Sequence, residues 1–406
     1  MMVAMATVAA ITGCGQDRAD ERVGVDPGPG TGPDATPSDA HTKSVVAAIN
    51  RLGFEMQAQV VRPGENTVTS PVSLAGLLGL LSAGADGQAA TDLTTRLALT
   101  GTQDTAIGAL LDQLASTSDV QLDVANSVWT NQGVSLQTPF SSFVHDTYHA
   151  EASTVPLGLP EGADAIDAWV KAATNGKIDG MADALGLPDA SAVTVLLNAV
   201  YFNGTWSTEF DPAATRSAPF TLADHSTIDV PMMSLNLNEG SWESARGATF
   251  SLLRLPYGRD QRFAMEFILP NDVVDMAQFF KGLDVAAWQS ARAALTSGAE
   301  SVSVPRFTTT WTADLGESLR AVGLGSIYGA DALSKISDPA APLSTVAQKV
   351  FIQVDEHGTE AAAVSGGVTA TAAPIPFELN RPFGFAITDR DTDAVLFLGA
   401  INNPTA

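Results

Sequence analysis

The feature that most constrains this chain lies near its carboxyl end, where the stretch DEHGTEAAAVSGGVTATAAP covers residues 355–374. It follows directly on an apolar pattern typical of a strand, and no side chain between Ala361 and Pro374 is larger than valine. Such a segment has no large apolar group that could anchor it in a core. It is either a flexible linker or a segment that is mobile in one state and part of a sheet in another.

Two properties of this stretch favour a strand over a linker. Residues 356–373 contain no proline, so each can donate a backbone hydrogen bond to a sheet, whereas Pro374 and Pro376 come afterwards. Alternate residues of a strand face opposite sides, and the acidic residue of the small-residue run, Glu360, falls on one series. The other series is small and uncharged: Thr359, Ala361, Ala363, Ser365, Gly367 and Thr369.

The charge balance argues against several classes of partner. The chain has 406 residues, 45% of them hydrophobic, which is enough for one large core or two ordinary ones. Its formal net charge is −24, and only six of its 21 basic residues are lysines. Because there is no basic cluster, we expect no binding to nucleic acid and none to heparin-like polyanions.

The single cysteine, Cys14, follows the apolar stretch Met2–Ile11. One cysteine allows no internal disulfide, so the core has to hold the fold unaided. An apolar run, a small residue and then Cys resembles the lipobox of a bacterial lipoprotein signal, in which the cysteine is lipidated. We therefore expect residues 1–14 to be a lipoprotein signal that exports the protein to the outer membrane, the cell surface or the medium. The alternative is an ordinary terminus with an inert Cys.

The rest of the chain is expected to be one tethered domain. Residues 15–40 are rich in Gly, Pro, Asp and Thr and have almost no apolar side chains, which predicts a disordered tether. No second stretch of this kind and no internal repeat follows, so residues 41–406 are predicted to form a single domain. No other segment reaches 18 consecutive apolar residues, and we expect contact with a membrane only through a lipid anchor.

Helix patterns gather early in this domain and strand patterns late. Helices are expected from Pro71 to Gly84, with Ser70 as the N-cap, and over Gln88–Leu97 and Asp164–Ala173. Strands rich in Val, Ile, Phe and Leu are expected over Val193–Phe202, Phe263–Leu269, Val302–Phe307, Val350–Val354, Phe383–Ile387 and Val395–Leu398. This order favours the α+β class over a repeating βαβ layout.

The sequence offers little for catalysis. It contains no Gly-x-Ser-x-Gly, Walker A, His-Glu-x-x-His or Gly-x-Gly-x-x-Gly motif. His145 and His149 are spaced like half of a metal site, but two polar residues on an amphipathic helix explain them as well. His357 lies beside Glu356 and Glu360 in a Gly/Ala-rich stretch that is unsuited to fixed geometry. We expect no enzymatic activity, no metal and no cofactor.

Several stretches, in order over residues 41–406, together resemble one family, the serpins. They are Asn66–Ser73 (NTVTSPVS), Gly84–Gly87 (GADG), Ile166–Ile178 (IDAWVKAATNGKI), Asn198–Trp206 (NAVYFNGTW) with Phe210, Leu255–Gly258 (LPYG), Val304–Phe307 (VPRF), Asp355–Ala363 (DEHGTEAAA), Asn380–Phe383 (NRPF) and Phe397–Pro404 (FLGAINNP). Each match alone is weak, but the ordered set is highly specific.

The resemblance implies the serpin fold, with three β-sheets, eight or nine helices and an exposed reactive loop near the carboxyl end. Inhibitory serpins trap serine proteases, and sometimes cysteine proteases. The protease cleaves the loop, whose amino-terminal part then inserts as a new strand into the large central sheet. The insertion carries the acyl-linked protease to the far pole and distorts its active site. We expect the chain to act as a monomer.

The stretch 355–374 falls where serpins have this loop. The hinge residues are Glu356, Gly358, Thr359, Glu360, Ala361, Ala362 and Ala363. Insertion of about 12–14 residues, at roughly 3.3 Å each, would add a strand of about 40–45 Å. The small hinge residues favour an inhibitor, because non-inhibitory serpins usually carry bulky, charged or proline residues there. The pair Gly366–Gly367 loses more backbone entropy on insertion, which leaves the efficiency of inhibition open.

The reactive bond is expected at one of two neighbouring positions. Counting from the hinge makes Ala372 the scissile residue, so that the bond joins it to Ala373, whereas counting back from Asn380 makes Thr371 the scissile residue. The neighbourhood, Thr369–Ala373, holds neither the Arg or Lys of a trypsin substrate nor a large aromatic residue. Small side chains suit elastase-like or subtilisin-like proteases, whose pockets are shallow.

Other positions match those that open the central sheet in serpins. The polar shutter beneath the central strands corresponds to Ser70, Ser73 and Asn198, with Gln348 where the family has a histidine. Trp206 falls at the top of the sheet, where the loop first inserts, and Arg306 and Glu356 fall where a salt bridge closes that region. The leading hypothesis is a covalent suicide inhibitor. A non-inhibitory serpin that binds or carries another molecule is the main rival, and a hydrolase is a distant third.

Overall fold

The computed structural model of the chain describes residues 39–115, 120–174, 176–236, 242–297, 301–358 and 376–406. Residues 1–38, which include Cys14 and most of the predicted tether, lie outside this range. Helix α1 begins at Asp39, two residues inside the range predicted for the tether. Among the described helices, none has the length and hydropathy needed to cross a membrane.

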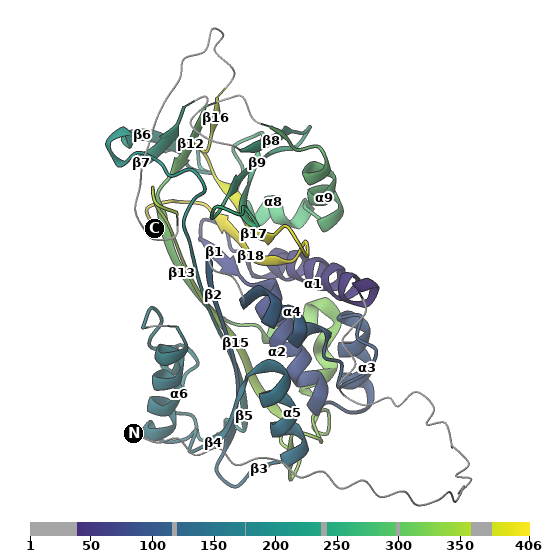
Figure 1. The fold of residues 1–406 in the computed structure, drawn as a ribbon. Helices are drawn as coiled ribbons and strands as arrows, with labels where there is room; N and C mark the ends of the chain where they lie inside the picture. Colours follow the sequence, from purple (N-terminus) through teal and green to yellow (C-terminus); the bar gives the residue numbers. More distant parts are fainter. Residues whose placement is uncertain (1–38, 116–119, 175, 237–241, 298–300, 359–375) are drawn as a thin grey trace, which may run out of the picture. The chain divides into compact units, whose positions relative to one another are not determined.

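Helices and sheets contribute about equally to the described part, which confirms the α+β class (Figure 1). The helices are α1 (Asp39–Val60), α2 (Pro71–Gly84), α3 (Gly87–Arg96), α4 (Ala106–Ala115), α5 (Thr138–Tyr148), α6 (Pro160–Ala173), α7 (Met181–Ala184), α8 (Met276–Gly282), α9 (Val285–Ala293) and α10 (Gly316–Leu319). The resemblance implies eight or nine helices. The described part has ten because α7 and α10 are single turns of four residues.

Three larger sheets are present among the described residues, as the resemblance implies. The five-stranded sheet has the order β13 (Phe307–Asp314), β15 (Leu343–Val354), β5 (Thr194–Gly204), β2 (Val120–Asn131), β4 (Glu151–Val155). The seven-stranded sheet has the order β1 (Thr67–Thr69), β18 (Val395–Ile401), β17 (Phe383–Asp389), β10 (Phe263–Pro270), β9 (Phe250–Pro256), β8 (Glu243–Arg246), β11 (Thr296–Ser297). The four-stranded sheet has the order β16 (Phe377–Glu378), β12 (Val302–Pro305), β7 (Thr227–Leu235), β6 (Arg216–Thr221). A short pair joins β14 (Ser337–Asp338) to β3 (Ser135–Leu136).

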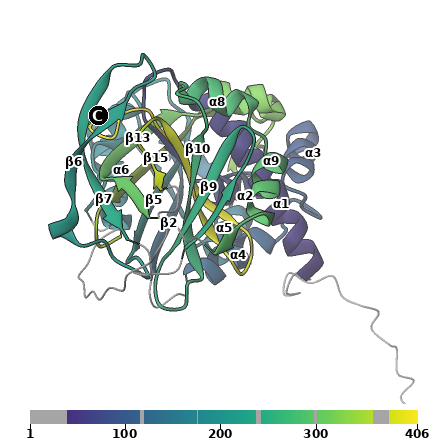
Figure 2. The same ribbon diagram turned by 90° about the horizontal axis from the view of Figure 1, so that it is seen from above.

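The five-stranded and seven-stranded sheets share one core. Phe202 of β5 packs edge-on against Phe397 of β18, with 5.7 Å between the ring centroids. Helices α6 and α7 cover the other face of the five-stranded sheet (Figure 1), where Val170 and Ile178 lie in one cluster with Val195. Helices α1, α8 and α9 cover the other face of the seven-stranded sheet (Figures 1 and 2). The five-stranded sheet is therefore buried on both faces, as its mostly apolar strands require.

Helix α2 lies beside the core-facing side of the five-stranded sheet and is buried along its whole length. A helix that is apolar on every face, as PVSLAGLLGLLSAG is, has to be enclosed by other elements. Pro71 occupies the first turn, where its missing N–H costs no hydrogen bond. Ser70 stands at the predicted N-cap position, but its hydroxyl donates to the carbonyl of Leu396 at 2.6 Å instead of capping the helix.

The strand predicted over Val302–Phe307 is two strands in two different sheets. Strand β12 ends at Pro305 and pairs with β7, and β13 begins at Phe307 and pairs with β15. Pro305 has no N–H to continue a ladder, and Arg306 stands at the switch between the sheets. The other predicted strands are present, although β15 begins at Leu343 rather than at Val350.

Candidate functional site

The two central strands of the five-stranded sheet, β5 and β15, form a parallel ladder that we call the seam. It pairs Leu343 with Thr194 at one end and Phe351 with Tyr201 at the other. The outer neighbours of these strands, β2 and β13, are both antiparallel to them. The seam is thus a place where one additional strand running the opposite way would make antiparallel pairs on both sides. Antiparallel pairs are slightly more stable per residue than parallel ones.

Above the seam, a tight turn over Asp355–Gly358 reverses the chain as it leaves β15. The N–H of Asp355 donates to the carbonyl of Gly358 at 3.0 Å, and the N–H of Gly358 donates to that of Asp355 at 3.2 Å. Gly358 also forms an antiparallel bridge to Thr205, the residue that follows β5. Gly358 therefore stands between the continuations of the two seam strands and is antiparallel to both.

Only glycine fits at position 358. Its φ of +124° lies in a region that residues with a side chain rarely adopt. A Cβ atom there would lie 2.2 Å from the carbonyl oxygen of Gly204 and 2.7 Å from the backbone nitrogen of Trp206. Both contacts are to backbone atoms, which cannot rotate away. The close approach of the chain to the end of β5 thus depends on this residue.

Trp206 closes the top of the seam. Its indole N–H donates to the carbonyl of Asp355 at 3.0 Å, and its backbone N–H donates to the carbonyl of His357 at 3.0 Å. The indole stacks on the ring of Tyr257, with 4.3 Å between centroids and 9° between planes. Because the indole is 3% exposed, its hydrogen bond to the turn is protected from water and holds the turn onto the sheet.

Glu356 is a buried carboxylate held by two neighbours. The Nε of Arg306 donates to it at 2.7 Å, and the hydroxyl of Thr215 donates to the same oxygen. The Glu356 side chain is 3% exposed, whereas that of Arg306 is 42% exposed. Burial opposes the ionisation of Glu356, but the hydrogen bonds from Arg306 and Thr215 outweigh it and lower the pKa of the carboxyl below its ordinary value. The ion pair ties the end of β15 to the switch between two sheets.

A buried polar network crosses the seam near its middle. Gln348 of β15 stands directly opposite Asn198 of β5, and its amide donates to the Asn198 side chain at 2.9 Å. The Gln348 amide also accepts from the N–H of Ser70 at 3.0 Å and donates to the carbonyl of the same residue at 3.2 Å. Asn198 in turn donates to the hydroxyl of Ser73 and to Asn126. Glutamine thus bonds two predicted shutter residues, Asn198 and Ser70, and joins both strands to the start of α2.

The comparisons with known proteins agree on one family. The model of the serpin (serine protease inhibitor) family matches residues 47–404. Glia-derived nexin of Rattus norvegicus is 31% identical over 369 residues, which cover 87% of this chain and 91% of the relative. Serpin-Z10 of Arabidopsis thaliana is 31% identical over 362 residues, which cover 85% and 93%. The chain belongs to the serpin family.

Solved structures place this serpin on the same fold. The crystal structure of native protease nexin-1 with heparin has a TM-score of 0.79 at 27% identity and covers 89% of this chain and 100% of that one. Human thyroxine-binding globulin, complexed with its ligand, has a TM-score of 0.80 at 24% identity. Uncleaved ovalbumin has a TM-score of 0.78 at 21% identity. The last two likenesses are to the fold alone, and together with the sheets above they confirm the predicted serpin fold.

The predicted site residues fall into two groups. Those brought together around the seam are Ser70, Ser73, Asn198, Trp206, Arg306, Gln348, Glu356 and Gly358. The predicted hinge residues Thr359–Ala363 and reactive-bond residues Thr371–Ala373 lie outside the described residues, as does the predicted lipidation site Cys14.

Four residues of this serpin site were not predicted from the sequence: Asn126, Thr215, Tyr257 and Asp355. Tyr257 and Asp355 lie inside the matched stretches Leu255–Gly258 and Asp355–Ala363, and Asn126 carries a signal of a different kind. It is 2% exposed, and the sequence shows an Asn-Ser pair inside the apolar strand VQLDVANSVWTN. A buried polar pair of this kind needs partners. Thr215 acts on Glu356 from a distant part of the chain, which no local pattern could indicate.

The histidines do not form a catalytic or metal site in the described part of the chain. His145 lies in α5, but His149 follows the helix end with a φ of 50°, so the two are not on one helical face. Each bonds an exposed aspartate, Asp146 and Asp112 respectively. No group of three potential ligands is found among the described residues. His357 bonds Glu209 at 2.9 Å and lies in the turn above the seam.

Proposed function

We propose that this serpin inhibits serine proteases by covalent trapping with insertion of its reactive loop into the seam. The observation that carries the proposal is the position of Gly358, which already pairs antiparallel with the continuations of β5 and β15. The chain beyond Gly358 would become a strand between them by extending in the same direction, once the ladder between β5 and β15 has opened. The residues that would follow, Thr359–Ala370, carry the alternation of small side chains that such a strand needs.

The dimensions of the seam support this proposal. Strand β15 has 12 residues and β5 has 11, which corresponds to about 40 Å of extended chain. The proposed insert of about 12–14 residues has the same length. On the core side the new strand would lie among buried side chains such as Leu196, Val200 and Val350. Only small uncharged side chains fit there, because larger ones would overpack the core and charged ones would lose their hydration.

The trap itself would use the chemistry of the attacked protease. The protease serine attacks the carbonyl of Thr371 or Ala372, the next amide nitrogen leaves as the new amino terminus, and an ester joins the two proteins. Insertion of the loop would then separate this ester from the groups that hydrolyse it. The small residues around the bond favour elastase-like or subtilisin-like enzymes over trypsin-like ones.

This proposal is tested by incubating the protein with an elastase, a subtilisin and trypsin and separating the products under denaturing conditions. We expect an SDS-stable complex, of the combined mass, with a small-pocket protease, and none with a protease whose active-site serine has been blocked. Mass spectrometry of the released carboxyl-terminal peptide would identify the scissile bond. Clean cleavage of the loop without any complex would refute the inhibitory function and support the non-inhibitory alternative.

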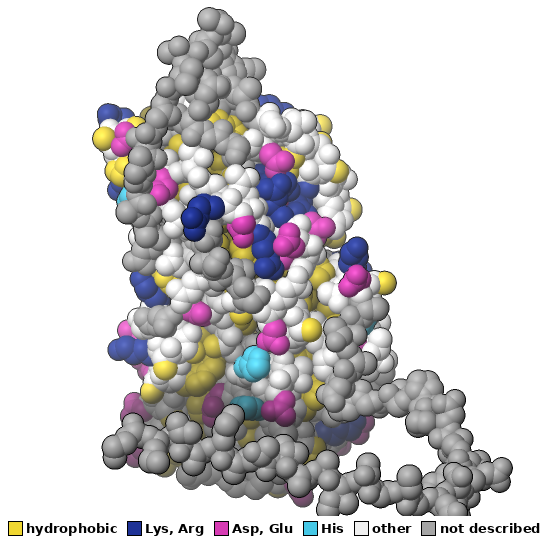
Figure 3. Space-filling view, viewed as in Figure 1, with side chains coloured by type: hydrophobic (Ala, Val, Ile, Leu, Met, Phe, Trp, Pro, Cys, Tyr) yellow, Lys and Arg dark blue, Asp and Glu magenta, His cyan; other side chains and the backbone are white. Residues whose placement is uncertain are grey.

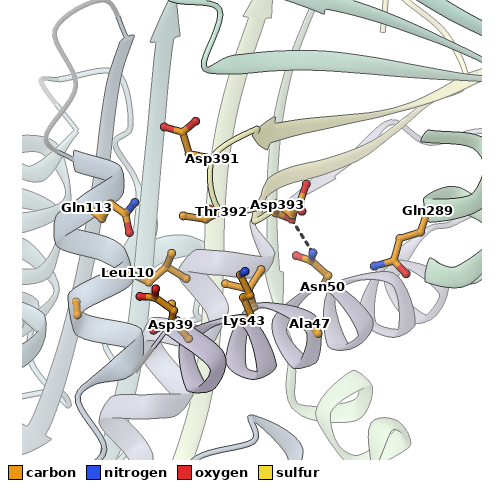
Figure 4. Close-up of a pocket in the computed structure, with 13 residues that line it drawn as sticks. Asp39, Lys43, Ala47, Asn50, Leu110, Gln113, Gln289, Asp391, Thr392 and Asp393 are labelled. Carbon is orange, nitrogen blue, oxygen red and sulfur yellow. Dashed lines mark hydrogen bonds between the residues drawn. The ribbon is translucent and has the colours of Figure 1, made fainter. Parts of the chain in front are cut away.

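A binding or carrier function is the second candidate, and one cavity favours it. A cavity of about 700 Å³ lies between α1, α4 and the turn that joins β17 to β18 (Figure 4). Its wall carries Asp39, Lys43, Asp391 and Asp393, and Asn50 donates to the carbonyl of Asp393 at 2.8 Å. A wall of this polarity suits a polar or cationic molecule rather than an apolar one.

We also propose that the protein is exported and carried on a lipid anchor at Cys14, with residues 15–38 as the tether. The lipobox-like sequence and the composition of the tether support this reading. Growth with radioactive palmitate in a bacterial host should label the protein, and Cys14→Ser should abolish the label. Equal labelling of both forms, or none of either, would refute the anchor.

We propose that the protein acts as a monomer and binds neither nucleic acid nor heparin-like polyanions. Family membership alone does not decide the second point, because a relative has been crystallised with heparin. The charge of −24 supports it. On the face shown in Figure 3, the Lys and Arg side chains form small groups with Asp and Glu between them. We expect no retention on a heparin column at 0.15 M salt, roughly physiological ionic strength, and retention there would contradict this proposal.

A further inference from the structure

A second cavity, away from the seam, combines unpaired cations with apolar walls. It has a volume of about 760 Å³ and is formed by α1, the end of α3, the link between α8 and α9, and the segment that follows α10. We call it the α1–α9 groove. Helices α1, α3, α8 and α9 lie on the same side of the sheets in both ribbon views (Figures 1 and 2). The volume is that of a site for a small molecule.

Three basic side chains line the α1–α9 groove, Arg51, Arg96 and Lys281, against two acidic ones, Glu55 and Asp284. The local charge is therefore +1, in a chain whose net charge is −24. Among the described residues, Arg51 and Lys281 make no ion pair and no side-chain hydrogen bond. The carboxylate of Asp284 already accepts a hydrogen bond from the N–H of Ala287 at 2.7 Å and caps α9.

Arg96 is the basic residue that is most deeply set in the groove. Its guanidinium pairs with Glu55, but its buried Nε has no hydrogen-bond partner. An unpaired buried N–H carries a desolvation cost that a ligand oxygen would remove. Burial and, to a smaller extent, the nearby positive charge of Arg51 lower the pKa of Arg96. One anion between the two guanidinium groups would relieve the repulsion between their like charges.

The rest of the groove wall is largely apolar. Leu283 and Val285 line it from the link into α9, and Val322 lines it from the segment after α10. At Gly323 the backbone turns out of helical geometry with a φ of +88°, a conformation that glycine adopts at little cost. The break stops this segment from continuing as a regular helix beside α1. Apolar wall and basic groups thus lie in one continuous cavity.

We propose that the α1–α9 groove binds a small amphipathic carboxylate, with the carboxylate between Arg51 and Arg96 and an acyl chain along the apolar wall. Guanidinium groups recognise carboxylates through paired N–H donors. Lys281 adds a third positive charge at the mouth of the groove. This site is independent of the seam and of the proposed inhibitory function.

Calorimetric titration with decanoate, kept below its micellar concentration, tests the proposal on the full chain. We expect one site per chain, and binding about three- to tenfold weaker for each of Arg51→Gln and Lys281→Gln. The matched control is Lys171→Gln, which removes one exposed positive charge from α6, outside the groove. It should bind decanoate as the wild type does. Melting curves of all four proteins check that the variants are folded.

Four results would overturn the assignment. Decanoate that does not bind the wild type, or that binds the two groove variants as tightly as the wild type, would show that these cations are not a carboxylate site. Decanol that binds as tightly as decanoate would show that the charge is not recognised. Inorganic phosphate that binds as tightly as decanoate would show that the apolar wall is not used.

Discussion

At the scale of single residues, Glu356 makes a prediction that depends on pH. Its pKa is lowered in the folded protein, so its ionised form stabilises the native state above the ordinary glutamate value of 4.5, and this stabilisation is lost as pH falls further. Glu356→Gln should therefore lower the free energy of unfolding at pH 7, by about 2 kcal/mol for a lost charged hydrogen bond. Below pH 4.5 the difference from the wild type should shrink.

The measurement is urea unfolding of both proteins from pH 7 down to pH 3. Glu378→Gln is the matched control, because the Glu378 side chain is exposed and, within the described part of the chain, accepts one hydrogen bond, from the neighbouring Asn380. This control should stay within about 0.5 kcal/mol of the wild type at every pH. A constant difference between Glu356→Gln and the wild type over the whole range would contradict the role given to the Arg306–Glu356 pair.

Gln348 makes the second prediction at this scale. Gln348→Ala should leave Asn198 and the backbone of Ser70 with unpaired buried groups, and lower the free energy of unfolding by about 2–4 kcal/mol for two or more lost partners. Gln353→Ala, on the same strand but at a half-buried position with one long contact of 3.4 Å, should cost less than about 1 kcal/mol. Equal costs in chemical unfolding would show that the network does not hold the seam.

Individual site residues were predictable only where a local motif carried them. The motifs around Trp206, Arg306 and Glu356 predicted a shared region at the end of the central sheet, where Trp206 bonds Asp355 and Arg306 bonds Glu356. Thr215 could not be predicted, because it meets Glu356 across 141 residues of sequence and lies in none of the matched motifs. Because Gln348 replaces the family histidine, the sequence alone did not show whether the polar network is complete. The positions of Ser70 and Asn198 show that the Gln348 amide makes the hydrogen bonds.

At the scale of elements, apolar periodicity located most strands but not every boundary. Strand β15 starts seven residues before its expected position, since Ser344, Gln348 and Lys349 interrupt the apolar run. The split at Pro305 was missed because β12 ends and β13 begins within two residues of each other. The apolar pattern predicts that a strand is present. Pairing with β7 or with β15 decides which sheet the strand joins.

The hinge makes a prediction about an element, the proposed inserted strand. Thr359→Arg places a guanidinium on the series that would face the core, and burying an unpaired charge should stall insertion. Glu360→Arg places the same side chain on the opposite series, where the native charge already lies. We expect Thr359→Arg to be cleaved as a substrate with little complex formed, and Glu360→Arg to inhibit nearly as well as the wild type.

The stoichiometry of inhibition against a small-pocket protease distinguishes these two variants. It should rise at least about tenfold for Thr359→Arg, as expected if burial of the charge costs more than 1.4 kcal/mol. It should change little for Glu360→Arg. Similar values for both variants would mean that the alternation of the loop residues does not correspond to the two faces of a strand.

At the scale of the whole molecule, the proposed mechanism requires a native state that is not the most stable one. The seam holds two parallel strands side by side, although the sequence that follows Gly358 has a matching length and suitable side chains for a strand between them. The loop lacks apolar anchors, so it gains little from inserting until cleavage frees one of its ends. In the proposed mechanism, the free energy of the added strand is therefore released only after the protease has cleaved the loop.

Loop insertion is tested most directly by comparing the melting temperature of the intact protein with that of the protein cleaved in its reactive loop. A protease that cleaves within Thr369–Ala373 without being trapped can be used to prepare the cleaved form. Cleaved wild type should melt well above the intact protein, by more than about 10 °C, because one full-length strand is added to the five-stranded sheet. An unchanged melting temperature would contradict loop insertion and the inhibitory function together.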